Sequence, residues 1–254
     1  MIIVKCSNIR KYFPVQRGYL KEKHGVVKAV DGVTLSIEKG GTFGLVGESA
    51  SGKTTLAKVM LGIIKPDSGE CELATDRVQV IFQDPFNSLD PKMRVGAIVA
   101  EGLVLSSRAR LNVPYRCFDG QAVRGKVEEM LELVHLPKGA ASKYPHQFSG
   151  GERQRIAIAR AVITKPELII CDEPVSSLDV TIQLQILKLL KDIQKEFGMT
   201  YLFISHDLRV IRYMCNRVAV MRQGKIVEEG ETQAVYSNPS SQYTKLLLSS
   251  VLSI

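Results

Sequence analysis

One short glycine-rich segment constrains the fold of this chain more than any other feature. Residues 47–54 read GESASGKT and match the pattern GxxxxGK[ST], with an apolar run (42–46) before them and an apolar-periodic helix (54–64) after them. Small residues allow consecutive backbone N–H groups to surround a phosphate, and the helix N-terminus adds the positive end of its dipole. We therefore predict a phosphate-binding loop between a buried strand and a helix. Its expected nucleotide-binding residues are Gly47, Glu48, Ser49, Ala50, Ser51, Gly52, Lys53, Thr54 and Thr55.

Two side chains of this loop have a defined chemistry. Lys53 can reach the β- and γ-phosphates of ATP, and the Thr54 hydroxyl can ligate Mg²⁺. Further buried strands are expected at 78–82, 168–171 and 201–204, and an amphipathic helix at 181–197. Strands that alternate with helices favour a mostly parallel sheet, which binds ligands at the carboxyl ends of its strands.

Charged side chains follow two of these expected strands. Asp172 and Glu173 end the run 168–171, and His206 follows the run 201–204. Asp172 would face Mg²⁺ through a water, Glu173 would face the attacking water, and His206 would hydrogen-bond the γ-phosphate, which suits transfer of a phosphoryl group from ATP to water. The alternatives are a solvated strand end for the two acids and a structural role for the histidine.

Other parts of the chain are less specific. We expect short strands at 2–6 and 33–37, separated by a polar, basic loop at 16–28, and a hairpin that joins 218–221 to 225–229. Helical spacing dominates residues 95–165, which predicts an inserted helical sub-domain. The expected organisation is one nucleotide-binding domain over 1–254, with this insert and a helical tail at about 233–254.

Composition excludes several classes of protein. The 254 residues are 45% hydrophobic and 24% charged, which is ordinary for a globular protein, and the net charge is +8. The cysteines are odd in number and contain no CxxC pair, so we expect neither a disulfide framework nor a thiolate metal site, and we expect a reducing compartment. No apolar run has the length of a transmembrane helix, and the N-terminal residues do not resemble a signal peptide. The cysteines are Cys6, Cys71, Cys117, Cys171 and Cys215.

Several motifs in order resemble one family. Residues 148–155 (FSGGERQR) resemble the LSGGQ signature of ATP-binding cassette (ABC) ATPases, and Gln83, Asp179 and His206 stand where that family has its Q-loop, D-loop and switch histidine. The resemblance covers about residues 4–248. It implies the ABC ATPase fold: an α/β, P-loop NTPase (RecA-like) parallel-sheet core with an antiparallel β sub-domain and an inserted α-helical sub-domain.

The resemblance also implies a mechanism. Two cassettes would pack head to tail, so that the signature of one contacts the γ-phosphate of ATP bound to the other. Phe13 would stack on adenine, with Tyr12 as the alternative, and Gln83 would join Thr54 and Asp172 around Mg²⁺. The expected catalytic residues are Glu173, His206, Gln83 and Lys53, and the expected signature residues in trans are Ser149, Gly150, Gly151 and Glu152.

A narrower resemblance concerns residues 82–103 and the tail 238–247 (NPSSQYTKLL), which are similar to the oligopeptide, dipeptide and nickel importers of the family. It implies an ATPase that energises import, bound to a second cassette (the same chain or a sibling) and two permease subunits at the cytoplasmic face of the membrane. An extracytoplasmic binding protein would be an indirect partner, and peptide and nickel cargo remain open. The alternatives are a soluble ABC ATPase that acts on nucleic acid or ribosomes, which the dispersed charge disfavours, and a non-hydrolysing regulatory subunit.

The sequence departs from the family pattern at three places. Ala50 stands where glycine is common, which costs stability only if this residue needs a positive φ. Glu152 replaces the usual signature glutamine and adds a negative charge. The segment 69–78 is short, which trims the antiparallel sub-domain. A cysteine-bearing C-terminal extension is absent, so we expect no iron–sulfur cluster.

Overall fold

The computed structural model describes residues 1–17, 22–84, 88–111 and 120–251. The chain divides into two compact units, the first formed by residues 1–78 and 200–254 and the second by residues 79–199. Among the described residues, no helix is both long enough and apolar enough to cross a membrane.

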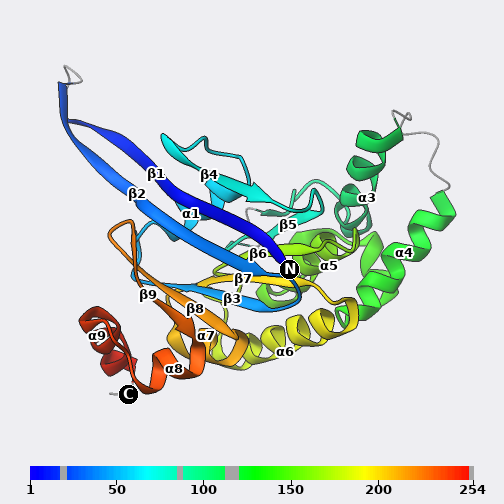
Figure 1. Ribbon diagram of the computed structural model, residues 1–254. Coiled ribbons are helices and arrows are strands. Elements are labelled where there is room, and N and C mark those ends of the chain that lie inside the picture. The colour runs from blue at the N-terminus through cyan, green and yellow to red at the C-terminus, as the bar shows by residue number, and fades with distance from the viewer. Residues whose placement is uncertain (18–21, 85–87, 112–119, 252–254) are drawn as a thin grey trace. The chain divides into compact units, whose positions relative to one another are not determined.

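A three-stranded antiparallel sheet begins the first unit. The long hairpin of β1 (Ile2–Arg17) and β2 (Glu22–Glu38) pairs along its length, and β4 (Ser68–Leu73) pairs with the other edge of β1 (Figure 1). The expected loop at 16–28 is therefore wrong where the structure describes it, because residues 16–17 and 22–28 belong to strands. Backbone pairing, such as that of Phe13 with Val27, compensates here for a weak apolar pattern.

Four further strands of this unit are hydrogen-bonded in the order β7-β3-β8-β9. Strand β3 (Thr42–Val46) lies parallel to β7 (Thr200–Ser205) and to β8 (Arg217–Arg222), and β9 (Lys225–Glu231) is antiparallel to β8. The predicted hairpin is confirmed, since the turn residues Gln223 and Gly224 both have positive φ. Helices α1 (Lys53–Met60) and α7 (Leu208–Met214) contact these sheets, and α8 (Thr232–Ser237) and α9 (Gln242–Val251) complete the unit.

The second unit is mainly helical. Strands β5 (Val78–Ile81, which starts at the unit boundary) and β6 (Leu168–Asp172) are neighbours, and α6 (Val180–Phe197) follows β6. Within residues 95–165 lie α3 (Val95–Leu111), α4 (Gly120–Leu133), two 3₁₀ helices and α5 (Gly150–Val162). Helix α5 contacts α3, α4 and α6. The 3₁₀ helices are η2 (Lys138–Ser142) and η3 (Pro145–Gln147).

The expectation for the cysteines is wrong at one pair. Cys6 and Cys71 form a disulfide between β1 and β4, where they occupy facing positions with their Cα atoms 4.1 Å apart. They are 65 residues apart in sequence, so their spacing gave no sign of this pairing. Cys171 and Cys215 are buried free thiols, whereas Cys117 lies outside the described residues.

The C-terminal helix α9 buries polar residues rather than its leucines. Leu246 is 64% exposed, and Leu247 and Leu248 are half-buried. Tyr243 and Thr244 are buried. The helix therefore presents a more polar face to the protein than its leucines suggest.

Candidate functional site

The glycine-rich loop has the predicted flanks. Strand β3 is buried throughout, and α1 begins at Lys53, one residue after a glycine with φ of 109°. A side-chain carbon at Gly52 would collide with the carbonyl of Ala29, and one at Gly47 would collide with the carbonyl of Met221. The loop therefore needs glycine at both positions, and its backbone lies against neighbouring strands.

Lys53 points back along the loop. Its ammonium donates to the carbonyl oxygens of Gly47 (2.7 Å) and Glu48 (2.8 Å) and lies 3.3 Å from the Ser51 hydroxyl. The side chain is only 5% exposed, whereas the next residue, Thr54, is exposed. A buried cation thus lies among the backbone groups of the loop. Its positive charge can attract a bound phosphate.

Ala50 occupies the left-handed region with φ of 63°. A Cβ in this region costs about 1 kcal/mol, so we expect Ala50→Gly to raise the free energy of unfolding by about that amount. Denaturant titration of both proteins measures this. As a control, Ala57→Gly in the regular helix α1 should lower stability by a similar amount. A lower stability of Ala50→Gly than of wild type would contradict the argument.

His206 leaves the same sheet edge as the loop. Strands β3 and β7 are parallel, and the last pair in their register is Val46 with Ser205. Gly47 and His206, the next residues of each strand, therefore start side by side. His206 is exposed, and Asp207 caps α7 by accepting from the Arg209 N–H at 2.8 Å.

The structure separates the two aromatic candidates. The Tyr12 hydroxyl donates to Asp31 at 2.6 Å, which holds its ring in a network of charged side chains. Phe13 is 38% exposed, with the Lys11 ammonium 5.7 Å from its ring centroid. An exposed ring beside a cation suits stacking on a base better than a ring whose hydroxyl is engaged.

In the second unit, the Q-loop candidate meets the candidate base. The Gln83 amide nitrogen donates to the Glu173 carboxylate at 3.2 Å. Asp172 ends β6, and Glu173 follows with φ of 49°, so it lies in a turn rather than in the strand. Its carbonyl accepts from the Ser176 N–H and hydroxyl, which fixes that turn. A non-glycine residue with this φ is uncommon and is typical of functional sites.

The serine-glycine-glycine segment caps α5 through a capping box. The Ser149 N–H and hydroxyl both donate to Glu152 Oε2, at 2.8 and 2.9 Å, and the Glu152 N–H donates back to the hydroxyl at 3.3 Å. These contacts, first of all that with the Ser149 N–H, hold the pKa of the Glu152 carboxyl below its usual value. In the free chain, therefore, an ionised carboxylate already binds the Ser149 hydroxyl.

The segment before α6 lies against this cap. Asp179 is the N-cap of α6 and accepts from the Ile182 N–H at 3.0 Å. A Cβ at Gly150 would contact Leu178 at 3.6 Å, and one at Gly151 would come within 2.6 Å of Ile182. The structure thus brings together the residues predicted as signature and D-loop.

Comparison with known proteins decides the family. Residues 30–176 match the family described as ABC transporter. The chain belongs to the ABC transporter family. It is accordingly an ATP-binding cassette with ATPase activity, and the similarity extends well beyond the matched region.

Three relatives are similar to this chain over nearly its whole length. It is 43% identical to the oligopeptide transport ATP-binding protein AppF of Bacillus subtilis (strain 168), covering 98% of this chain and 78% of AppF. It is 42% identical to OppF of Lactococcus lactis subsp. lactis (strain IL1403), named for the same activity, covering 99% and 81%. It is 39% identical to the dipeptide transport ATP-binding protein DppF of Haemophilus influenzae (97% and 77%).

Solved ABC cassettes share the fold. A dimeric structure of the cassette MJ0796, in a post-hydrolysis state bound to ADP and Pi, superposes with a TM-score of 0.75 at 26% identity, covering 90% of this chain and 98% of that one. The ADP conformation of the cassette MJ1267 gives 0.77 at 25% identity, covering 97% and 99%. The predicted ABC ATPase fold is confirmed.

Sequence reasoning missed one contact of the nucleotide loop. The Glu48 N–H donates to the hydroxyl of Tyr243, on the C-terminal helix α9, at 3.4 Å. One sequence feature pointed to Tyr243, because this residue belongs to the tail that resembles the importer branch. The contact itself could not be predicted, because a contact between residues 195 positions apart has no periodic signature.

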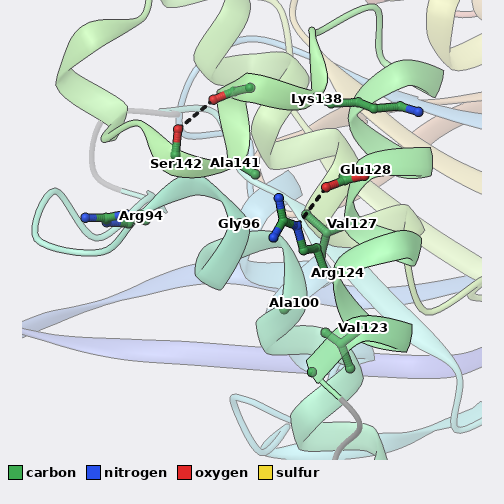
Figure 2. Close-up of a pocket in the computed structure, with 12 residues that line it drawn as sticks. Arg94, Gly96, Ala100, Val123, Arg124, Val127, Glu128, Lys138, Ala141 and Ser142 are labelled. Atoms are coloured by element: carbon green, nitrogen blue, oxygen red, sulfur yellow. Dashed lines mark hydrogen bonds and ion pairs between the residues drawn. The ribbon is translucent and has the colours of Figure 1, made fainter.

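The helical unit of the cassette also carries an open cleft. Helices α3, α4 and η2 enclose about 490 Å³ (Figure 2). Ala100, Val123 and Val127 supply apolar surface, and the Arg124–Glu128 pair (2.9 Å) lies beside them. Such a cleft, apolar with charged edges, suits a helical segment of another protein.

Proposed function

We propose that this chain is the ATP-hydrolysing subunit of an importer for di- or oligopeptides. The observation that carries the proposal is the similarity to oligopeptide and dipeptide transport ATP-binding proteins over at least 97% of this chain. The names of these relatives favour peptides over nickel as the cargo. They also favour a transport role over the alternative of a soluble ATPase acting on nucleic acid or ribosomes.

The proposed chemistry divides the work between charge and positioning. Lys53 and the backbone of the phosphate loop bind the phosphates of ATP, and Phe13 stacks on the adenine. Glu173 accepts a hydrogen bond from the attacking water and aligns it, while the Gln83 amide orients the carboxylate. His206 donates to the γ-phosphate. Because phosphoryl transfer requires little covalent help, such positioning accounts for most of the rate.

The proposed cofactor is Mg²⁺. Its expected ligands, Thr54, Gln83 and Asp172, all offer oxygen atoms, which this ion prefers. In the part of the chain that the structure describes, no three His, Cys, Asp or Glu side chains form a metal-binding group. In the proposed site the ion would be held by few protein oxygens, together with phosphates and water. When bound, the ion would neutralise charge on the phosphates.

The proposed partners are a second cassette and two permease subunits, with a binding protein outside the membrane as an indirect partner. The second cassette, the same chain or a sibling, would receive Ser149, Gly150 and Gly151 at its γ-phosphate, with Asp179 beside them. The permease would insert a helical segment into the cleft of the helical unit. The proposed location of the chain is accordingly the cytoplasmic face of the membrane, where it would be a peripheral subunit.

The test is a reconstituted transporter. Vesicles that contain the permease pair and both cassettes, with the binding protein added, should hydrolyse ATP faster when a di- or oligopeptide is supplied, and Ni²⁺ should have no such effect. Stimulation by Ni²⁺ alone would overturn the peptide assignment. If the rate of ATP hydrolysis is the same with and without the permease, but rises when RNA is added, the transport role is overturned.

The cleft supplies a structure-based variant for the same assay. Ala100→Trp would fill the cleft, and we expect about fivefold less peptide-stimulated hydrolysis, with ATP binding retained. Ala122→Trp is the matched control, because Ala122 is exposed on α4 but does not line the cleft. Equal stimulation in the two variants would exclude the cleft as the permease contact.

A further inference from the structure

The C-terminal part of the first unit supports the phosphate loop at three points. The carbonyl of Met221 on β8 touches the backbone at Gly47 so closely that no side chain fits there. The Gly224 N–H in the β8–β9 turn donates to the Ser51 carbonyl at 2.9 Å. The third point is the hydroxyl of Tyr243, which accepts from the Glu48 N–H.

Helix α9 holds Tyr243 in a fixed place. The Glu228 carboxylate on β9 accepts from the N–H groups of Ser240 (2.7 Å) and Ser241 (3.1 Å), just before α9 begins. The Arg222 guanidinium lies 4.6 Å from the centroid of the Tyr243 ring. The ring is 5% exposed, so it is buried between this cation and the loop.

Burial raises the pKa of Tyr243, so its hydroxyl keeps its proton at neutral pH. The oxygen of this neutral hydroxyl accepts the hydrogen bond from the Glu48 N–H. Helix α9 is therefore linked to the loop through the backbone of Glu48.

The peptide groups of Glu48 are thus held from two sides. Lys53 binds the carbonyl at 2.8 Å, and Tyr243 binds the N–H. A phosphate in the loop competes with the carbonyls for the Lys53 ammonium, since the anion is the stronger acceptor. The contact with Tyr243 does not involve Lys53, so binding of the phosphate does not require it to break.

We propose that Tyr243 is a positioning residue of the nucleotide site: its hydroxyl holds Glu48, and with it the start of the phosphate loop, in the conformation that receives the nucleotide. This inference rests on the proposed function, because it assumes that the loop binds the phosphates of ATP. It makes the C-terminal helix a part of the nucleotide site rather than an appended packing element.

The test compares two tyrosine variants of the full-length chain. Tyr243→Phe keeps the ring and its contact with Arg222 but removes the hydroxyl that accepts from the Glu48 N–H. We expect the Kd for fluorescently labelled ADP, and the KM for ATP in the assembled transporter, to rise about threefold with kcat nearly unchanged, because the N···O distance of 3.4 Å is long. The loop must then be ordered by the nucleotide itself.

Tyr236→Phe is the matched control. The Tyr236 hydroxyl donates to the Leu208 carbonyl at 2.5 Å, away from the loop, so its loss should lower thermal stability and leave the nucleotide Kd unchanged. The inference is overturned if Tyr243→Phe binds ADP as wild type does, or if both variants weaken binding equally. Failure of the wild-type chain to bind ADP would instead overturn the proposed function, and the inference with it.

Discussion

Replacing Glu173 with glutamine lowers ATP hydrolysis in the assembled transporter about a hundredfold or more, and leaves ATP binding intact. A positioned base contributes about a hundredfold to ten-thousandfold to a rate, and glutamine cannot take up a proton. Glutamine keeps the size of the side chain, and its amide oxygen can still accept from the Gln83 amide, which now lies 3.2 Å from the carboxylate. The change therefore removes the charge without removing the contact.

The measurement is steady-state ATPase activity, together with size-exclusion profiles with and without Mg-ATP. We expect ATP to trap the variant, but not wild type, as a stable pair of cassettes. The two cassettes close around ATP by associating head to tail, and in the variant no hydrolysis follows to separate them. Glu167→Gln is the matched control: it removes one carboxylate just before the opposite end of β6 and should leave turnover unchanged. Turnover of Glu173→Gln within about twofold of wild type would exclude Glu173 as the catalytic base.

Local features explain why much of the site was predictable from sequence. The phosphate loop is encoded by adjacent residues: a buried strand, glycines at positions that admit no side chain, and the lysine that starts α1. The same holds for the amphipathic helix predicted at 181–197, which is α6 in the structure and has Ile186, Leu190 and Ile193 fully buried. In each case a short stretch carries both the pattern and the geometry.

Contacts between distant segments could not be predicted in the same way. The Cys6–Cys71 disulfide depends on the register of β1 with β4, which no local pattern specifies. Residues 22–28 mix charged residues and a glycine with Val26 and Val27, so no regular alternation marks them as a strand, and pairing with β1 makes them one. The helical tail was predicted, but burial of Tyr243 was not, because its contact lies with a loop 195 positions earlier in the sequence.

The signature is one of the places where this chain departs from the family pattern, because Glu152 replaces the usual glutamine. In the proposed pair of cassettes, the Ser149 hydroxyl donates to the γ-phosphate bound by the partner. In the free chain the same hydroxyl donates to Glu152 at 2.9 Å. Closure must therefore break a charge-assisted hydrogen bond and bring two negative groups together, both of which oppose closure.

Glu152→Gln should therefore promote closure. Glutamine retains the capping box, since its amide oxygen can accept from the Ser149 N–H as the carboxylate does, but it carries no charge. We expect the ATP-trapped pair to form at about tenfold lower protein concentration, which corresponds to about 1.4 kcal/mol and is the size of one charged rather than neutral hydrogen bond.

The experiment uses Glu173→Gln as the background, so that hydrolysis does not obscure association. The double variant with Glu152→Gln is titrated with Mg-ATP by light scattering against the single variant. Glu128→Gln is the matched control, because Glu128 is a carboxylate of the same unit that pairs with Arg124 on α4. If the charge of the whole unit mattered, both glutamines would promote association; if only the contact with Ser149 matters, Glu152→Gln alone does. Equal association of the single variant and the Glu152→Gln double variant would mean that the carboxylate does not compete with the phosphate, and the family glutamine and this glutamate would then be equivalent caps.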